Sequence, residues 1–190
     1  MMCKDTSQGI TFINEYVMSE NTLSPNSLAF IALSNEYCHT LENIFDFERD
    51  EFIAKMLKIL PRIYIAASDI NINQFEENFF AESYLDEESY NAVKNNVCRL
   101  LEDDDVYLEV FMEDMKYSDT PLGSSISENL ADIYQPLFNL VAGVKDATIE
   151  AANEFLADCK ADFETYWGQT LCNVLRALHS LRFGTDNRNY

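Results

Sequence analysis

The sequence predicts an all-α fold, a helical bundle of about five to six helices with a long C-terminal helix. Three observations carry this prediction. Apolar residues recur at helical spacing through most of the chain. Glycine and proline are scarce, at five and four residues, whereas all-β proteins need many turn residues. Hydrophobic residues make up 47% of the 190 residues, which suffices for one core and is short for two domains.

We expect one domain across residues 1–190. Residues 1–23 form an N-terminal arm or a short first helix, with an apolar patch at 10–18. The bundle occupies residues 24–183, and residues 184–190 are a tail that follows Gly184.

The first two bundle helices have clear signals. Ser24-Pro25 opens a helix, because serine is a favoured N-cap and proline suits the first helical position, and we expect it to reach about Phe45. A second helix begins near Asp50 and contains Pro61, which removes one backbone hydrogen bond and should kink it. Its apolar stripe comprises Phe52, Ile53, Met56, Leu57, Leu60, Ile63 and Ala67.

The two middle connections lack helical periodicity. Residues 69–85 are irregular, and their aromatic cluster either caps an end of the core or lines a ligand pocket. That cluster is Phe75, Phe79, Phe80 and Tyr84. A third helix spans about 86–101, and residues 102–124 follow it. Alternating apolar residues from Val106 allow a short strand, but we find no partner for it and expect an extended connection over the bundle.

Two helices complete the bundle. Ser125 and Glu128 have capping-box spacing at the start of the fourth helix, which contains Pro136. The segment 146–183 keeps one apolar face, so we expect a single helix of roughly 35 residues. Gly168 costs ~1 kcal/mol in a helix interior, and a break near it is the alternative.

Charge excludes several classes of partner. The formal net charge is -20 and the pI is near 4.2. Nucleic-acid binding depends on Lys and Arg that neutralise phosphates, so we expect neither nucleic acid nor a membrane surface as partner. Lys55, Lys58 and Arg62 share one side of the second helix, where they neutralise neighbouring carboxylates or, alternatively, dock an acidic partner.

Cysteine usage and hydropathy favour the cytoplasm. The five cysteines form no C-x-x-C motif, as expected for free thiols in a reducing compartment. The N-terminus has no apolar run of signal-peptide length, and no window approaches the ~20 apolar residues of a membrane span.

The sequence contains two partial metal-binding motifs, and each lacks a feature that such a site requires. In NEYCHTLENI, Glu36 and His39 have the Glu-x-x-His spacing of a di-metal half-site. Helical phase, however, places both on the polar face, where we expect them to be solvated, and points Tyr37, Cys38 and Leu41 at the core. The acidic run EDDDVYLEVFMED lacks the turn glycine and the third ligand of an EF-hand loop, so we expect a solvated loop. We therefore expect no catalytic residues, no cofactor and no metal.

The segments ISENLADIYQPLFNLV, DDDVYLEVF and FETYWGQTLCNVLRALHSL carry a family resemblance. With NEYCHTLEN and LPRIYIAAS, they resemble an uncharacterised bacterial domain-of-unknown-function family found in Bacteroides and its relatives. The resemblance covers about residues 24–183, and the WG-containing segment is its most specific part. It implies a cytoplasmic all-helical domain with no assigned activity and supplies no catalytic residues.

These observations favour a non-catalytic helical interaction module that binds a protein partner or a second copy of itself. The alternative is a small-molecule-binding protein or enzyme with a pocket between kinked helices, since Pro61 and Pro136 could open one. The candidate residues for a shallow surface site or pocket are Tyr134, Tyr166, Trp167, Arg176 and His179. The competing interpretation makes the same segment an aromatic core layer with a solvated basic end.

Overall fold

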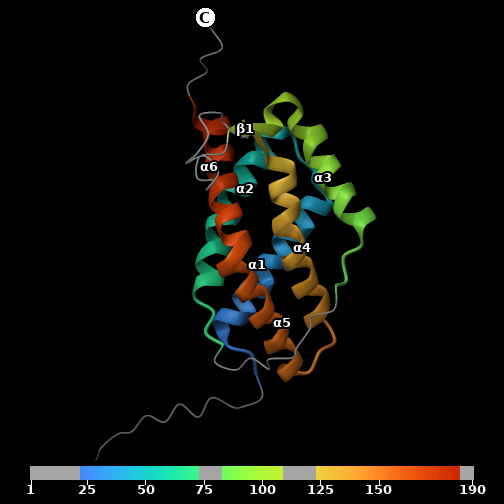
Figure 1. Cartoon of the computed structure of the whole chain (residues 1–190), viewed down its shortest axis with the longest axis vertical. Helices are drawn as coiled ribbons and strands as arrows, with labels where there is room; N and C mark the ends of the chain where they lie inside the picture. The colour runs from blue at the N-terminus through green and yellow to red at the C-terminus, as the bar shows by residue number, and fades with distance from the viewer. Residues whose placement is uncertain (1–21, 73–82, 109–122, 185–190) are drawn as a thin grey trace, which may run out of the picture.

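The computed structural model describes residues 22–72, 83–108 and 123–184 (Figure 1). Over these residues the chain forms five helices and one two-stranded sheet, so the all-α prediction is confirmed. The first four helices are α1 (Pro25–Glu42), α2 (Arg49–Ser68), α3 (Glu87–Leu101) and α4 (Ile126–Val144). The fifth comprises α5 (Ile149–Asp162), a π-helical turn (Phe163–Trp167) and α6 (Gly168–Phe183). Single 3-10 turns follow α1 (Ile44–Asp46) and α3 (Glu102–Asp105).

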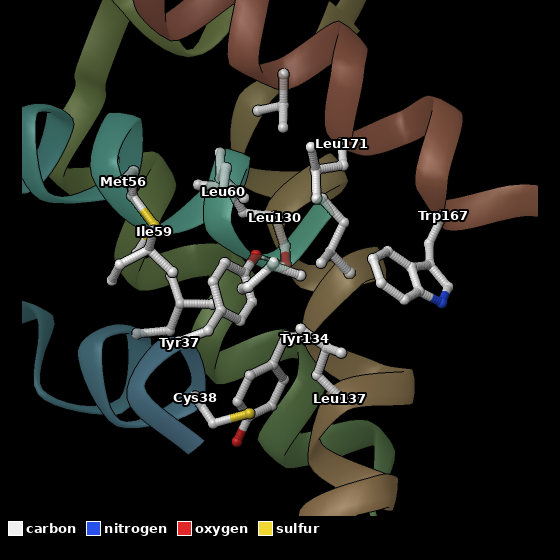
Figure 2. Close-up of a cluster of buried hydrophobic side chains, with 14 of the residues drawn as sticks. Tyr37, Cys38, Met56, Ile59, Leu60, Leu130, Tyr134, Leu137, Trp167 and Leu171 are labelled. Atoms are coloured by element: carbon white, nitrogen blue, oxygen red, sulfur yellow. Dashed lines mark hydrogen bonds between the residues drawn. The ribbon is translucent and has the colours of Figure 1, made fainter. Parts of the chain in front are cut away.

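Helix α4 lies at the centre of the bundle, with α3 on one side and α6 on the other (Figure 1). It also packs on α1 and α5, while α2 packs between α1 and α6. All these helices contribute to one hydrophobic core. Figure 2 shows side chains of α1, α2, α4 and the C-terminal helix converging there, among them Tyr37, Leu60, Leu130 and Trp167.

The helix starts follow the local signals in the sequence. Ser24 Oγ accepts a hydrogen bond of 3.0 Å from the Ser27 amide, and Pro25 is the first helical residue. Ser125 Oγ caps α4 by accepting from the Glu128 amide at 3.3 Å. Helix α1 ends at Glu42, before the expected Phe45, and the 3-10 turn continues the chain. Pro61 and Pro136 lie inside α2 and α4 as predicted.

The prediction of a strand without a partner is wrong. Strand β1 (Val106–Leu108) pairs antiparallel with β2 (Gly123–Ser125), with Val106 opposite Ser125. The sequence GSS of β2 has no apolar alternation, so only the tertiary pairing reveals it as a strand. Beside this pair, the buried Asp105 accepts hydrogen bonds from the Ser127 amide at 2.7 Å and the Ser125 hydroxyl at 2.7 Å. The sheet is thereby tied to the start of α4.

The last helix is continuous over 35 residues, so the prediction of one long helix is confirmed and the break near Gly168 is not found. The helix is not regular throughout, because a π-helical turn replaces the α-helical hydrogen-bonding pattern directly before Gly168. A Cβ at residue 168 would lie 2.5 Å from the carbonyl oxygen of Phe163. Glycine is therefore required there by the close approach of the π-turn.

Several predictions concern residues outside the described ranges. These residues are the apolar patch at 10–18, residues 109–122 of the connection 102–124, and Phe75, Phe79 and Phe80 of the aromatic cluster. Tyr84 is described, and its ring centroid lies 6.1 Å from that of Phe155. None of the helices within the described ranges has the length and hydrophobicity needed to cross a membrane.

Candidate functional site

The largest of the grooves that we describe runs between α2 and the C-terminal helix, with a volume of about 500 Å³. We call it the α2–α6 groove. Tyr64 enters it from α2, is 41% exposed, and packs edge-on against the buried Phe163 ring at 5.2 Å between centroids. Its lining residues are Tyr64, Phe163, Glu164, Gly168, Gln169, Cys172, Asn173 and Arg176.

The π-turn shapes this groove. Within the turn, Phe163 and Trp167 are buried while Tyr166 is 56% exposed. Because Gly168 has no side chain, the surface beside the Phe163 ring stays open. Cys172 and Arg176 follow at i, i+4 on α6, so they share a face with each other. Arg176 Nη2 donates to the carbonyl oxygen of Leu108 at 2.9 Å, which holds the guanidinium at the end of the groove.

A second groove of about 280 Å³ lies on the other side of α2, against α1. We call it the α1–α2 groove. It is mainly apolar, and Ile65 on its edge is 60% exposed. Its lining residues are Asn26, Ala29, Leu33, Arg62, Ile65, Ala66 and Asp69.

Glu36 is not merely solvated, contrary to the prediction. Its carboxylate accepts hydrogen bonds from Lys55 Nζ at 2.5 Å and from Arg62 Nη1 at 3.1 Å, and its side chain is 33% exposed. The hydrogen bond from Lys55 lowers the pKa of Glu36, against a smaller opposing effect of burial. Glu36 lies on the side of α1 that faces α2. Helical phase assigns each residue only to a core face or a polar face, so it does not predict contacts at the border between the two faces. The prediction that the basic side of α2 neutralises carboxylates is confirmed for Lys55 and Arg62.

Asp132 of α4 joins α3 to the C-terminal helix. Its Oδ1 accepts a hydrogen bond from the Tyr90 hydroxyl at 2.7 Å, and its Oδ2 accepts one from the Tyr166 hydroxyl at 2.8 Å. Burial, followed by the hydrogen bond to Asp132, raises the pKa of Tyr166 to about 12 and raises that of Tyr90 further. Both hydroxyls therefore stay protonated at neutral pH and act as hydrogen-bond donors, not as bases.

A smaller cavity of about 140 Å³ adjoins Pro136 of α4. Asp158 and Asp162, one turn apart on α5, both line it, and burial raises the pKa of each carboxyl. The Asn139 Oδ1 atom accepts hydrogen bonds from the amides of Tyr84 and Leu85 at 2.9 and 3.0 Å. These bonds hold the segment that begins at Ser83 against α4 at one side of the cavity. Ser83, Gln135, Leu140, Phe155 and Cys159 complete the lining.

The thiols within the described ranges are poor nucleophiles. Cys38 and Cys159 are buried, and that burial raises the pKa of each well above the ordinary thiol value. Burial also raises the pKa of the exposed Cys172 in the α2–α6 groove. No group of three or more His, Cys, Asp or Glu side chains that could hold a metal ion occurs among these residues.

The chain matches a known protein family over most of its length. The family described as "Domain of unknown function (DUF5063)" matches residues 21–184, which include all of the helices described above. The chain belongs to this family. The crystal structure of protein BF1032 from Bacteroides fragilis is similar to this DUF5063 chain, with 30% sequence identity and a TM-score of 0.76. The match covers 87% of this chain and 97% of that one. No functionally curated protein matches the sequence.

The DUF5063 fold distributes the five candidate residues over different environments. Tyr134 is buried and donates to Glu42 Oε1 at 2.9 Å, toward α1. Trp167 is fully buried, and its indole N–H donates to the carbonyl oxygen of Cys159 at 3.1 Å. Tyr166 turns to Asp132, and His179 is exposed with its ring 5.0 Å from that of Phe183. Arg176 alone among the five lines the α2–α6 groove.

Sequence reasoning missed Tyr64, Ile65 and Asp132. A signal for the first two was present, because both are large apolar residues of α2 outside its predicted core stripe. Large apolar residues outside the core stripe of a helix lie on its exposed surface, where they can form a binding site. Asp132 carried no signal, since its partners Tyr90 and Tyr166 lie 42 and 34 residues away along the chain.

Proposed function

We propose that this DUF5063 protein is a non-catalytic, cytoplasmic interaction module that binds a protein partner in the α2–α6 groove. The observation that carries the proposal is Tyr64, which is 41% exposed above a mostly apolar groove of about 500 Å³. Exposed apolar grooves on soluble domains mark binding sites, and Tyr and Arg are enriched among residues that dominate interface energies.

The geometry favours an amphipathic helix as the partner's contact element. The groove is formed between two helices, and such grooves accept the apolar face of a third helix. Arg176 at its end uses Nη2 to bind the Leu108 carbonyl, and a guanidinium has five N–H donors in all. We therefore expect an acidic residue of the partner at this position, beside apolar anchors that meet Tyr64 and Phe163.

The chemistry of the described side chains supports binding over catalysis. Raised pKa values keep Cys38, Cys159 and Cys172 as thiols, while nucleophilic catalysis requires the thiolate. Thiols kept reduced also fit the cytoplasm.

The test compares groove variants in the full-length protein. Gln169→Arg places a bulky charge in the groove, and Asn95→Arg places the same charge on the exposed surface of α3. Affinity purification from the native host, with mass spectrometry, nominates a partner that the wild type and Asn95→Arg retain and Gln169→Arg loses. Calorimetry with the purified partner should then show that Tyr64→Ala weakens binding by at least about tenfold. If Gln169→Arg and wild type bind every partner equally, the α2–α6 groove is not the interface.

Binding of a small molecule is the second candidate, favoured by the cavity at Pro136. Its volume of about 140 Å³ is well below the roughly 300–1,000 Å³ of drug-sized pockets, so only a ligand of a few heavy atoms fits. Thermal shifts with small amines and carboxylates, repeated on Asp158→Asn, separate this candidate from the first. A ligand that stabilises wild type and not Asp158→Asn supports it.

A further inference from the structure

The cavity of about 140 Å³ beside Pro136, here called the Pro136 cavity, contains two carboxylates without a cation. Asp158 and Asp162 line it from α5, one turn apart, where Cβ atoms are about 5–6 Å from each other. Among the described residues neither carboxylate has an ion-pair or hydrogen-bond partner. Burial raises the pKa of both, and the charge of Asp162 raises that of Asp158 further. The ionised pair is therefore stabilised by any cation that enters the cavity.

The single basic residue of α5 is directed away from the cavity. Lys160 Nζ donates to the carbonyl oxygen of Ala67 at 2.9 Å and lies 3.4 Å from Glu164 Oε1. It also lies 5.1 Å from the centroid of the Phe163 ring. Lys160 is thus held on the α2 side of the helix, and a ligand can supply the charge that it does not provide.

A buried thiol without a partner lies in the same wall. Cys159 lines the cavity and is 3% exposed, and its thiol has no hydrogen-bond partner among the described residues. Burial, followed by the charges of Asp162 and Asp158, raises the pKa of Cys159, so the thiol stays neutral beside the two carboxylates. The α5 wall therefore combines two anionic acceptors with one unpaired polar group.

The opposite wall is polar at one position and apolar at others. Gln135 of α4 has an amide oxygen that can accept a further hydrogen bond, and no bond of this side chain occurs within the described part of the chain. Leu140 and the ring of Phe155 are buried and give the cavity an apolar surface. A ligand that fits both walls has a cationic head and a short hydrocarbon body.

We propose that the Pro136 cavity binds a small primary alkylammonium ion. Its N–H groups donate to Asp158 and Asp162, since an ammonium group has three donors and both carboxylates accept. Its hydrocarbon chain packs on Leu140 and Phe155, and the volume admits about four carbons. An anion of the same size is repelled by both carboxylates. The inference rests on the second candidate function, small-molecule binding, and is independent of the α2–α6 groove.

Nuclear magnetic resonance of the full-length protein tests the proposal with three ligands of equal chain length. Butylammonium, butanol and butyrate are titrated separately, and the side-chain amide signals are followed. We expect butylammonium to shift the signals of Gln135 and Asn139, with a dissociation constant in the millimolar range, and to leave Gln169 and Asn173 of the α2–α6 groove unchanged. Butanol and butyrate should bind at least about tenfold more weakly.

Variants with the same change of charge separate the site from general attraction to an acidic protein. Asp158→Asn should weaken binding of butylammonium at least about tenfold, because it removes a charged acceptor. Asp162→Asn, at an exposed position, should weaken it as well and serves if Asp158→Asn does not fold. Asp146→Asn, exposed in the connection between α4 and α5, should stay within about twofold of wild type.

Each other outcome overturns the proposal. Unchanged signals of Gln135 and Asn139 mean that the cavity takes up no alkylammonium ion. Butyrate or butanol binding there as tightly as butylammonium overturns the ligand class, while small-molecule binding itself would stand. Equal weakening by Asp146→Asn and Asp158→Asn shows attraction by net charge alone. Circular dichroism verifies that each variant is folded.

Discussion

The Tyr166 hydroxyl donates a hydrogen bond of 2.8 Å to Oδ2 of Asp132, and it does so from the only part of the described C-terminal helix that is π-helical. The other oxygen of Asp132 accepts from Tyr90 at 2.7 Å. One carboxylate thus connects α3, α4 and the π-turn, which makes it a point where the stability of three elements is coupled.

Removing the hydroxyl of Tyr90 should destabilise the fold more than removing that of Tyr166. Tyr90 is partly buried, and Tyr166 is 56% exposed, so water replaces the lost bond more easily at Tyr166. We expect about 1–2 kcal/mol for Tyr90→Phe and less than about 1 kcal/mol for Tyr166→Phe. Urea denaturation followed by the fluorescence of the single, buried Trp167 measures both. Because both tyrosines bind Asp132, the double variant should deviate from the sum. Strict additivity would mean that they are uncoupled.

Gly168→Ala should destabilise the protein, opposite to the usual effect in a helix. Alanine normally stabilises a helix interior by about 1 kcal/mol relative to glycine. Here the new Cβ would lie 2.5 Å from the Phe163 carbonyl oxygen and 2.9 Å from its ring, so we expect a loss of about 1–3 kcal/mol. Thermal and urea denaturation measure the change. The neighbouring Gln169→Ala is the matched control on an exposed position and should stay within about 0.5 kcal/mol of wild type. A stabilised Gly168→Ala protein would contradict the close approach.

Asp105→Ala should cost about 2–3 kcal/mol of unfolding free energy, because it leaves two buried donors of Ser127 and the partly buried hydroxyl of Ser125 without their acceptor. Asp103→Ala, an exposed aspartate in the same 3-10 turn, should change stability by less than about 0.5 kcal/mol. Equal effects at the two positions in urea denaturation would show that Asp105 does not hold the start of α4.

Alkaline pH should destabilise the protein from about pH 9 upward. The folded pKa values of Cys38, Cys159, Tyr37 and Tyr134 are raised, chiefly by burial, above ordinary values of 9.0 for Cys and 10.0 for Tyr. Between its unfolded and its folded pKa, each group has lost its proton only in the unfolded state. Rising pH therefore favours unfolding by up to about 1.4 kcal/mol per pH unit for each group, and the stabilisation is complete only below the unfolded pKa.

Urea denaturation at several pH values between about 8 and 11, with tyrosinate absorbance in parallel, checks this prediction. We expect part of the ten tyrosines to ionise only when the protein unfolds. Ionisation of all ten near pH 10 with the helices intact would contradict the buried hydroxyls of Tyr37 and Tyr134.

The sequence by itself determined the helical architecture. Ser24 and Ser125 cap helices where their type predicts, because capping depends on residues within one turn of each other. The apolar stripe of α2 was predicted for the same reason, since helical periodicity is a local property. The long C-terminal helix followed from an apolar phase that does not reset at Gly168.

Only the tertiary structure decided which residues meet. The partner of β1, the two tyrosines on Asp132 and the ion pairs of Glu36 join residues that are far apart in the chain. The α2–α6 groove arises where Tyr64 of α2 meets the π-turn, and no spacing within either segment encodes that meeting. Local patterns determine which face of a helix is buried, while the packing of one helix on another decides what lies at the border of that face.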